Sequence, residues 1–394
     1  MTKKRQKDTE AIRIQAKRTH NNEHSVPIYM TSSFVYDNAE QMRAAFNDEI
    51  EVNMYTRFTN PNTDEFVAKM CALEGTEAGF ATATGMAAVF ASFGALLKMG
   101  DDILVCKSIF GATHTLLEKV MVKFGITHTN VELHDTANWH KYIKPNTKML
   151  FVETPTNPTL DLLDLEWVGK FTKQHNLIFN IDNCFATPVI QTPVDYGADI
   201  ITHSATKFLD GQGRTMGGIV LGRKDLIKDV YSFCRMTGPA MSPFNSWLLS
   251  KSLETLQIRM ERHSESALKL ATALESHPEV VRVKYPFLLS HPQYDIAKKQ
   301  MKTGGGVVTF YVEGGLERGK RFLDALEFCS MTANLGDSRT IASHPASTTH
   351  SKMPAADQLS IGIEPGMIRI SVGLENILDI INDLLSQHVG IFSF

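Results

Sequence analysis

Three apolar runs in the middle of the chain end directly in polar residues whose types could do chemistry. They occupy residues 151–158, 179–183 and 201–207. In an α/β sheet, ligands bind at the edge where the strands deliver their carboxyl ends, so the polar residues of the three runs are expected to meet there. Together they would supply an amide, a carboxylate, two hydroxyls and an amine.

This set of groups suits pyridoxal phosphate. The cofactor acts as an electron sink when its ring nitrogen stays protonated and its aldehyde is joined to a lysine as a Schiff base. Lys207, which follows the third run, would form the Schiff base, and Asp182, which ends the second, would hold the ring nitrogen. The sequence therefore predicts an enzyme that acts on an amino acid.

Other residues offer anion-binding groups for the phosphate and for a substrate carboxylate. Gly85 begins an apolar helical segment, where backbone N–H groups can approach a dianion. Ser204 and Thr206, two residues apart, would add hydroxyl donors. Arg57 would make a charge-assisted contact to the same phosphate, and Arg369, near the end of a late strand, would bind a substrate carboxylate with its forked guanidinium.

Each of these signals is weak alone. An isolated lysine is usually a solvated surface group, an isolated aspartate usually caps a helix or a turn, and Thr84-Gly85 is a common junction between a loop and a helix. An isolated arginine or tyrosine is more often an ion-pair or packing residue. The prediction depends on the joint occurrence of all of them in one α/β pattern.

Composition favours a small-molecule substrate. The 394 residues are 43% hydrophobic and 21% charged with a formal net charge of −3, so no basic excess attracts nucleic acid or an anionic membrane surface. The most apolar stretch, 86–97, is well short of the roughly 20 residues that span a bilayer. The amino terminus has no signal-peptide pattern and the five cysteines form no CxxC pair, which predicts a cytoplasmic protein with reduced thiols.

Two other kinds of site are disfavoured. The 14 histidines include no HExxH pair, so no metal site is predicted. The glycine run at 211–217 misses GxGxxG by one position and follows Lys207 instead of linking an early strand to a helix, so a nicotinamide site is not predicted either.

The elements that must position these residues follow from hydrophobic periodicity. Between about 65 and 250, short apolar runs alternate with amphipathic segments, which is typical of βαβ units around a mostly parallel sheet. One long helix is predicted over about 243–275. Beyond it, strands at 306–312 and 367–372 and helices near 317–327 and 376–388 predict a smaller C-terminal α+β domain. The domain prediction is an N-terminal arm at 1–60, a large domain at 61–255 and a small domain at 256–394.

The sequence resembles a known family, the pyridoxal-phosphate enzymes of cysteine and methionine metabolism (trans-sulfuration), from about residue 26 to the C-terminus. The resemblance rests on seven motifs in the family's order, at residues 55–61, 84–86, 153–158, 182–188, 204–207, 344–347 and 369–375. It implies a fold-type I, aminotransferase-like large domain and a homo-oligomer that is a dimer of dimers. Tyr55 and Arg57 of the arm would then reach the neighbouring subunit's site.

The resemblance also assigns roles to single residues. Lys207 and Tyr55 would be catalytic, and Tyr55 would also contact the cofactor. Further cofactor contacts are implied for Met86, Phe110 and Asn157, besides Asp182, Ser204, Thr206, Gly85 and Arg57. Substrate contacts are implied for Arg369, Asn334 and Arg339.

The subgroup is predicted from departures and local likeness. Family lyases usually place a tyrosine over the cofactor ring, where this chain has Phe110, and methionine γ-lyases carry a cysteine where it has Ala112. Segments 207–214 and 237–245 resemble the O-succinylhomoserine sulfhydrylases, and Arg339 suits an acidic acyl group. The expected reaction is γ-replacement on O-succinylhomoserine by sulfide, which gives homocysteine and succinate.

Three alternatives stay open. A cystathionine γ-synthase or γ-lyase, or an O-acetylhomoserine sulfhydrylase, would use the same scaffold and cofactor. A non-catalytic α/β binding protein is the remote alternative. A purified protein without colour or cofactor would favour the last of these.

Overall fold

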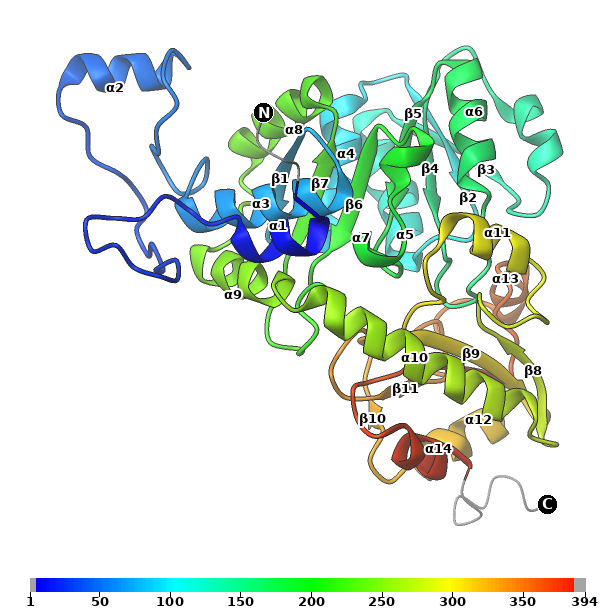
Figure 1. Cartoon of the computed structure of the whole chain (residues 1–394). Helices are drawn as coiled ribbons and strands as arrows, with labels where there is room; N and C mark the ends of the chain where they lie inside the picture. Colours follow the sequence, from blue (N-terminus) through cyan, green and yellow to red (C-terminus); the bar gives the residue numbers. More distant parts are fainter. Residues whose placement is uncertain (1–4, 386–394) are drawn as a thin grey trace.

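The computed structural model describes residues 5–385, which fold around two β-sheets (Figure 1). The strands in this range are β1 (Ala78–Thr82), β2 (Asp102–Cys106), β3 (Thr127–Val131), β4 (Thr147–Glu153), β5 (Ile178–Asp182), β6 (Ile200–Ser204), β7 (Gly218–Gly222), β8 (Val280–Lys284), β9 (Val307–Val312), β10 (Ser330–Met331), β11 (Ile341–Ser343) and β12 (Met367–Ser371).

Helices cover both sheets. In the same range the α-helices are α1 (Lys7–Arg13), α2 (Ala39–Phe46), α3 (Pro61–Glu74), α4 (Gly85–Leu96), α5 (Gly111–Lys119), α6 (Leu165–His175), α7 (Thr187–Ile190), α8 (Lys224–Thr237), α9 (Pro243–Leu253), α10 (Leu256–Glu275), α11 (Tyr294–Gln300), α12 (Gly315–Asp324), α13 (Ala355–Ser360) and α14 (Ile377–Leu385). Short 3-10 helices are η1 (Met121–Phe124), η2 (Thr136–Tyr142) and η3 (Pro193–Tyr196).

The larger sheet has the strand order β1-β7-β6-β5-β4-β2-β3. Strand β7 is antiparallel to both of its neighbours, β1 and β6, and the other neighbouring pairs are parallel. The predicted α/β fold with a mostly parallel sheet is confirmed. Because β4, β5 and β6 are adjacent and parallel, their carboxyl ends meet at one edge, as the sequence predicts.

Both faces of this sheet are buried. Along β2, Leu104 packs into one hydrophobic cluster while its neighbours Ile103 and Val105 pack into another, since side chains alternate between the faces of a strand. Residues of α3 and α6 share the first cluster, and residues of α4 and α5 share the second. Helices on both faces are what a parallel sheet requires, because neither face can be left in water.

The smaller sheet has the order β10-β11-β12-β9-β8, and its pairs are antiparallel except β10 with β11. Helices α10, α12 and α14 share one hydrophobic cluster with β9 and β12. This is the predicted smaller C-terminal α+β unit. The boundaries 1–60, 61–255 and 256–394 stay predictions. Residues 386–388 of the helix predicted near 376–388 lie outside the described residues.

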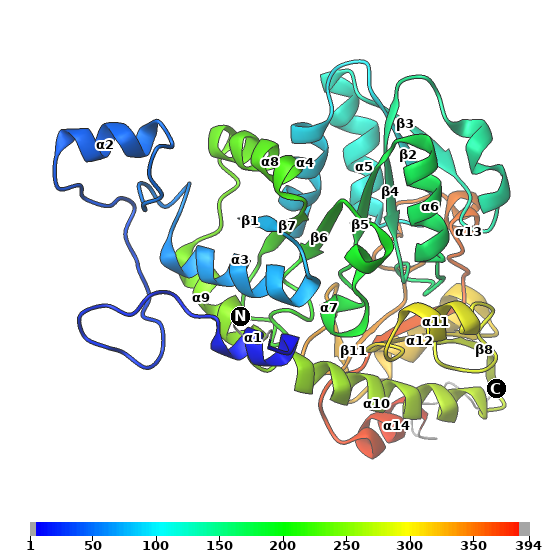
Figure 2. The same cartoon turned by 45° about the horizontal axis from the view of Figure 1, so that its top comes forward.

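The prediction of one helix over 243–275 was wrong, because the chain forms two helices, α9 and α10. Thr255, with φ −114° and ψ 6°, interrupts the helical backbone between them. Because of this break, the two helices can pack against different parts of the molecule. Helix α9 packs against α3, whereas α10 packs against β8 and β9 of the smaller sheet (Figure 2).

The N-terminal segment contains more regular structure than the sequence predicts. Helix α1 packs on α3, and α2 is capped by Asn38, whose side chain accepts a hydrogen bond from the backbone N–H of Gln41. Helix α2 lies away from both sheets in each view (Figures 1 and 2). The segment before α2 carries apolar side chains that are open to solvent: Val35 is fully exposed and Met30 is 69% exposed. Among residues 5–385, no helix has the length and apolar character needed to cross a lipid bilayer.

Candidate active site

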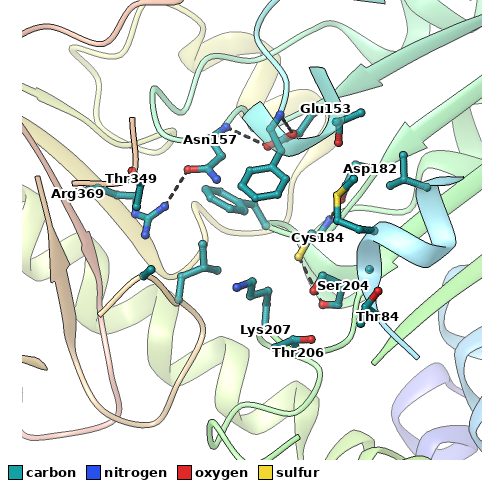
Figure 3. Close-up of a pocket in the computed structure, with 18 of the residues that line it drawn as sticks. Thr84, Glu153, Asn157, Asp182, Cys184, Ser204, Thr206, Lys207, Thr349 and Arg369 are labelled. Carbon is teal, nitrogen blue, oxygen red and sulfur yellow. Dashed lines mark hydrogen bonds between the residues drawn. The ribbon is translucent and has the colours of Figure 1, made fainter. Parts of the chain in front are cut away.

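The carboxyl ends of β4, β5 and β6 bring three polar residues together. Glu153 ends β4, and it is the register partner of Asp182, which ends β5. Ser204 ends β6 next to them, and Lys207 follows in the turn beyond Ser204. Figure 3 shows these side chains around one hollow between the sheet edge and the smaller unit.

The hollow is a cavity of about 240 Å³. Nine of the residues predicted for the site line it, namely Gly85, Met86, Phe110, Asn157, Asp182, Ser204, Thr206, Lys207 and Arg369. The rest of its lining consists of Thr84, Val89, Thr113, Glu153, Cys184, Phe185, Ala333, Leu335, Thr349 and His350. The roles given to the predicted residues stay predictions, but the chain does gather most of them in one place.

Lys207 has an amine suited to nucleophilic attack. Its Nζ donates a hydrogen bond of 2.6 Å to Oδ1 of Asn334. Burial lowers the pKa of Lys207, and the charge of Arg369 lowers it further. A larger share of the amine is therefore neutral than for a lysine in water, and the neutral amine is the form that condenses with an aldehyde.

Asp182 forms no ion pair with a lysine or arginine in the part of the chain that the structure describes. Burial raises the pKa of Asp182, while a 2.9 Å hydrogen bond from the backbone N–H of Cys184 and the charge of nearby His203 lower it. A protonated pyridine nitrogen beside it would stabilise the ionised form. His203 is itself held by a buried partner, since its Nε2 lies 2.6 Å from Oε1 of Glu74.

The start of α4 approaches the end of β6 so closely that only glycine fits. A Cβ added to Gly85 would lie 2.6 Å from Cβ of Ser204. Thr84 caps the helix, because its hydroxyl accepts a hydrogen bond of 3.1 Å from the backbone N–H of Ala87. The first N–H groups of α4 and the Ser204 hydroxyl therefore share one corner of the cavity, which is a suitable place for a phosphate.

Phe110 and Asn157 are both fixed by Glu153. Oε2 of Glu153 accepts a hydrogen bond of 2.8 Å from the backbone N–H of Phe110, and Oε1 accepts one of 3.0 Å from that of Asn157. Burial raises the pKa of Glu153, and the charge of Asp182 raises it further. The sequence motif included Glu153, but no role was predicted for it.

Arg369 reaches the cavity from β12 of the smaller sheet. Its Nη1 donates to Oδ1 of Asn157 at 2.8 Å, and its Nη2 donates to the backbone oxygen of Asn334 at 3.2 Å. Burial lowers the pKa of Arg369 to about 10. Within the described chain its buried Nε has no hydrogen-bond partner, so a donor remains for a substrate carboxylate.

Tyr55 and Arg57 lie outside this cavity. Tyr55 is 42% exposed. The Arg57 guanidinium lies 4.6 Å from the ring centroid of Phe58 and donates a hydrogen bond to the backbone oxygen of Arg235. Their predicted action in a neighbouring subunit stays a prediction.

Of the other two predicted substrate residues, Asn334 contacts Lys207 and Arg339 does not line the cavity. Nε and Nη2 of Arg339 each lie 2.9 Å from an oxygen of Asp337, in a forked ion pair. Nη2 also donates to the backbone oxygen of Gln212 at 3.0 Å. Contact with a substrate would need this guanidinium to leave its partners, so the role of Arg339 stays a prediction.

Sequence reasoning missed several residues around the cavity. His350 lines it beside Phe110's helix, and burial lowers the pKa of His350, with Arg369 adding to the effect. Glu74 and His203 form their buried pair directly behind the ends of β5 and β6. A histidine inside the apolar run at 200–203 was a usable signal, because a buried polar side chain in a strand needs a partner.

These features fit pyridoxal phosphate. The cavity contains a lysine with a lowered pKa and a carboxyl group whose ionised form a cationic ring nitrogen would stabilise. It also contains the start of a helix that a glycine lets approach Ser204, and an arginine whose Nε has no hydrogen-bond partner among the described residues. Such a site at the carboxyl edge of a mostly parallel α/β sheet defines the protein as a pyridoxal-phosphate-dependent enzyme.

The family follows from comparison with known proteins. The family model described as Cys/Met metabolism PLP-dependent enzyme matches residues 8–387. The chain belongs to this family, whose members carry out C–S bond chemistry with pyridoxal phosphate.

Individual relatives cover nearly the whole chain. An O-succinylhomoserine sulfhydrylase of Pseudomonas aeruginosa is 44% identical over 96% of this chain and 94% of its own length. An L-methionine gamma-lyase of Porphyromonas gingivalis is 41% identical over 91% of each. Among solved structures, a putative O-acetylhomoserine (thiol)-lyase from Campylobacter jejuni, which contains N'-pyridoxyl-lysine-5'-monophosphate, has a TM-score of 0.94 at 33% identity over 98% of this chain and 99% of that chain.

Proposed function

We propose that this chain replaces the succinyloxy group on Cγ of O-succinylhomoserine with sulfide, so that the Cγ–O bond breaks and homocysteine and succinate form. The observation that carries the proposal is the cavity itself, whose lining combines Lys207, Asp182 and Arg369 with Phe110. The 44% identity with an O-succinylhomoserine sulfhydrylase supports the choice of ester and of second substrate.

Each residue would have a distinct task. Pyridoxal phosphate, when bound, withdraws electrons from the Cα of the amino acid joined to it. Asp182 would hold the ring nitrogen protonated, and Arg369 would bind the substrate carboxylate through its fork. Lys207 would take the Cα proton of the bound amino acid, because its lowered pKa favours the neutral amine more than in a lysine in water.

Phe110 is the feature that favours replacement over elimination. Its ring can stack on the cofactor but offers no hydroxyl for proton transfer. Proton movement at the γ-leaving group would then depend on Lys207 and on Tyr55 of a neighbour. The runner-up function is γ-elimination, which the 41% identity with an L-methionine gamma-lyase favours.

The test is a product assay with purified holoenzyme. O-succinylhomoserine with sulfide should give homocysteine and succinate, faster than O-acetylhomoserine with sulfide does. Cysteine in place of sulfide should give little cystathionine, and methionine alone should give little 2-oxobutyrate. The Lys207→Ala variant is the matched control. Preferred formation of cystathionine or of 2-oxobutyrate would replace the proposal with a synthase or a lyase.

The proposal includes the assembly and the location. A homo-oligomer built as a dimer of dimers would cover the exposed apolar residues of the arm and bring Tyr55 and Arg57 to a second cavity. A cytoplasmic location is expected with the same function.

A further inference from the structure

Glu153 occupies a central position in the cavity wall. It is the last residue of β4, its side chain is 6% exposed, and each of its carboxylate oxygens accepts one backbone N–H. One donor is Phe110, just before α5, and the other is Asn157, in the loop after β4. Figure 3 shows both hydrogen bonds converging on this one carboxylate.

Through Asn157 the carboxylate is connected to the rest of the site. Oδ1 of Asn157 accepts from Arg369, and Arg369 donates to the backbone oxygen of Asn334. The side chain of Asn334 in turn accepts from Lys207. A continuous series of hydrogen bonds and covalent links therefore runs from Glu153 to the lysine, with the substrate-binding arginine in its middle.

Stability alone does not call for a carboxylate at this position. Glu153 is the register partner of Asp182, so two carboxyl groups face each other across neighbouring strands. Burying a second acid beside the first is unfavourable, and buried charges can often be replaced by neutral side chains without loss of stability. What a carboxylate provides that a neutral side chain lacks is a pair of equivalent acceptors for two N–H donors.

We propose that Glu153 is a positioning residue that fixes the ring of Phe110 relative to Asn157 and Arg369. It thereby sets the plane of the bound cofactor against the substrate carboxylate. The inference rests on the proposed function only for the identity of the substrate. The positioning itself concerns the cofactor and any amino acid that the site binds.

The test compares Glu153→Gln with a matched control, Asp383→Asn. Asp383 is also 6% exposed, and it accepts backbone N–H groups from Glu327, Phe328 and Cys329, within the smaller unit. In each variant an amide nitrogen replaces one acceptor oxygen, so at least one hydrogen bond from a backbone N–H is lost. Both holoenzymes are compared with the wild type by thermal unfolding, by visible circular dichroism per bound cofactor, and by the dissociation constant for L-norleucine, which has no γ-leaving group.

Glu153→Gln should change the circular dichroism of the bound cofactor and weaken norleucine binding about tenfold, which corresponds to the loss of one buried hydrogen bond. Asp383→Asn should lower the melting temperature and leave both readouts unchanged. If Glu153→Gln lowers only the melting temperature, Glu153 is merely structural and the inference is overturned. If Glu153→Gln does not fold, Glu153→Asp, which keeps the charge but is shorter, undergoes the same comparison.

These readouts separate the inference from the proposed function. A wild-type enzyme that makes no homocysteine would overturn the proposed function. The altered circular dichroism and norleucine binding of Glu153→Gln would then still support the positioning role. In the reverse case, the wild type makes homocysteine, but Glu153→Gln has the same circular dichroism of the bound cofactor as the wild type. That result would overturn the positioning role alone.

Discussion

Arg369 and Lys207 are two basic residues that line one cavity, and among residues 5–385 neither forms an ion pair with an acidic side chain. Arg369 contacts the oxygens of Asn157 and Asn334, and Lys207 contacts the side chain of Asn334. The positive charge of Arg369 lowers the pKa of Lys207, because protonating the lysine would place a second cation in the same enclosed space. The arginine therefore has two consequences, one for substrate binding and one for the state of the lysine.

Removing the charge of Arg369 should raise the pKa of Lys207. In the wild-type apoenzyme, the rate of Schiff base formation should rise with pH around a midpoint below 10.5, the ordinary value for lysine. In Arg369→Ala the midpoint should move upward, so that less neutral amine is present at pH 8. The measurement is the rate of cofactor uptake by apoenzyme as a function of pH. The same variant should lose roughly 10- to 150-fold in affinity for an amino acid carboxylate.

Arg369→Lys separates the two effects. It keeps a positive charge but has no planar fork, so the midpoint for Lys207 should stay low while carboxylate affinity still falls. An unchanged midpoint in both variants would show that Arg369 has no influence on the lysine.

At the scale of residues, the sequence allows a role to be predicted for a polar residue that directly follows an apolar run. It does not allow this for a residue that acts through its contacts with another residue. Asp182 and Lys207 were identifiable because each ends a run that predicts a strand. Glu153 also ends a run, but its partners are backbone N–H groups that carry no sequence signal. Arg369 and Asn157, which are hydrogen-bonded, are 212 positions apart, so their contact follows only from the fold.

At the scale of elements, the approach of α4 to β6 sets the phosphate corner. The backbone of the helix start can lie against Ser204 only because Gly85 has no Cβ. The N-terminus of a helix of this length adds its partial positive charge to the same corner.

Gly85→Ala should therefore weaken cofactor binding. The added methyl group must push the start of α4 away from Ser204, so the dissociation constant for pyridoxal phosphate should rise roughly 10-fold or more, as for the loss of a charged hydrogen bond. Equilibrium titration of apoenzyme measures it. Gly111→Ala is the matched control, since Gly111 begins α5 and its added Cβ would meet nothing closer than His350 at 3.8 Å. Equal weakening in both variants would contradict the steric explanation.

Elements with a strong apolar pattern were predictable, and weakly patterned ones were not. Strands β2, β4, β5 and β6 lie in the centre of the sheet and consist mostly of buried residues, so they appear as apolar runs. Strand β3 has the sequence THTNV and lies at the edge of the sheet, where it pairs with β2. A strand at the edge can carry polar side chains, so β3 does not appear as an apolar run. The break between α9 and α10 was not predicted because both helices carry a helical pattern up to the break.

At the scale of the whole molecule, the arm holds apolar side chains that the single chain leaves exposed to solvent. Val35 and Met30 are exposed, and α2 lies away from the body (Figure 1). Within the arm, Arg57 packs on Phe58 and does not line the cavity of its own chain. We expect such positions in an arm that completes the site of a neighbouring subunit. The hydrophobic periodicity of one sequence cannot predict them, because it carries no information about contacts between subunits.

Mixing two inactive variants tests this arrangement. Lys207→Ala lacks the lysine, and Arg57→Ala lacks the residue that a neighbour is expected to receive. If the site is shared, a mixed dimer has one site with both defects and one with neither, so random reassociation should restore activity at about a quarter of the sites. The measurement is turnover after the two proteins are dissociated and reassociated together, with each protein treated alone as the control. No recovery would show that both residues act within the same chain.

The identity of the cofactor-bearing lysine is the central claim, and it is tested most directly by reduction with borohydride and peptide mass analysis. The purified protein should be yellow, and reduction should leave the pyridoxyl phosphate group covalently fixed to the peptide that contains Lys207, because a reduced Schiff base cannot hydrolyse. Lys207→Ala should be colourless and unmodified under the same treatment. Modification of a different lysine, or a wild-type protein that takes up no pyridoxal phosphate, would contradict the account.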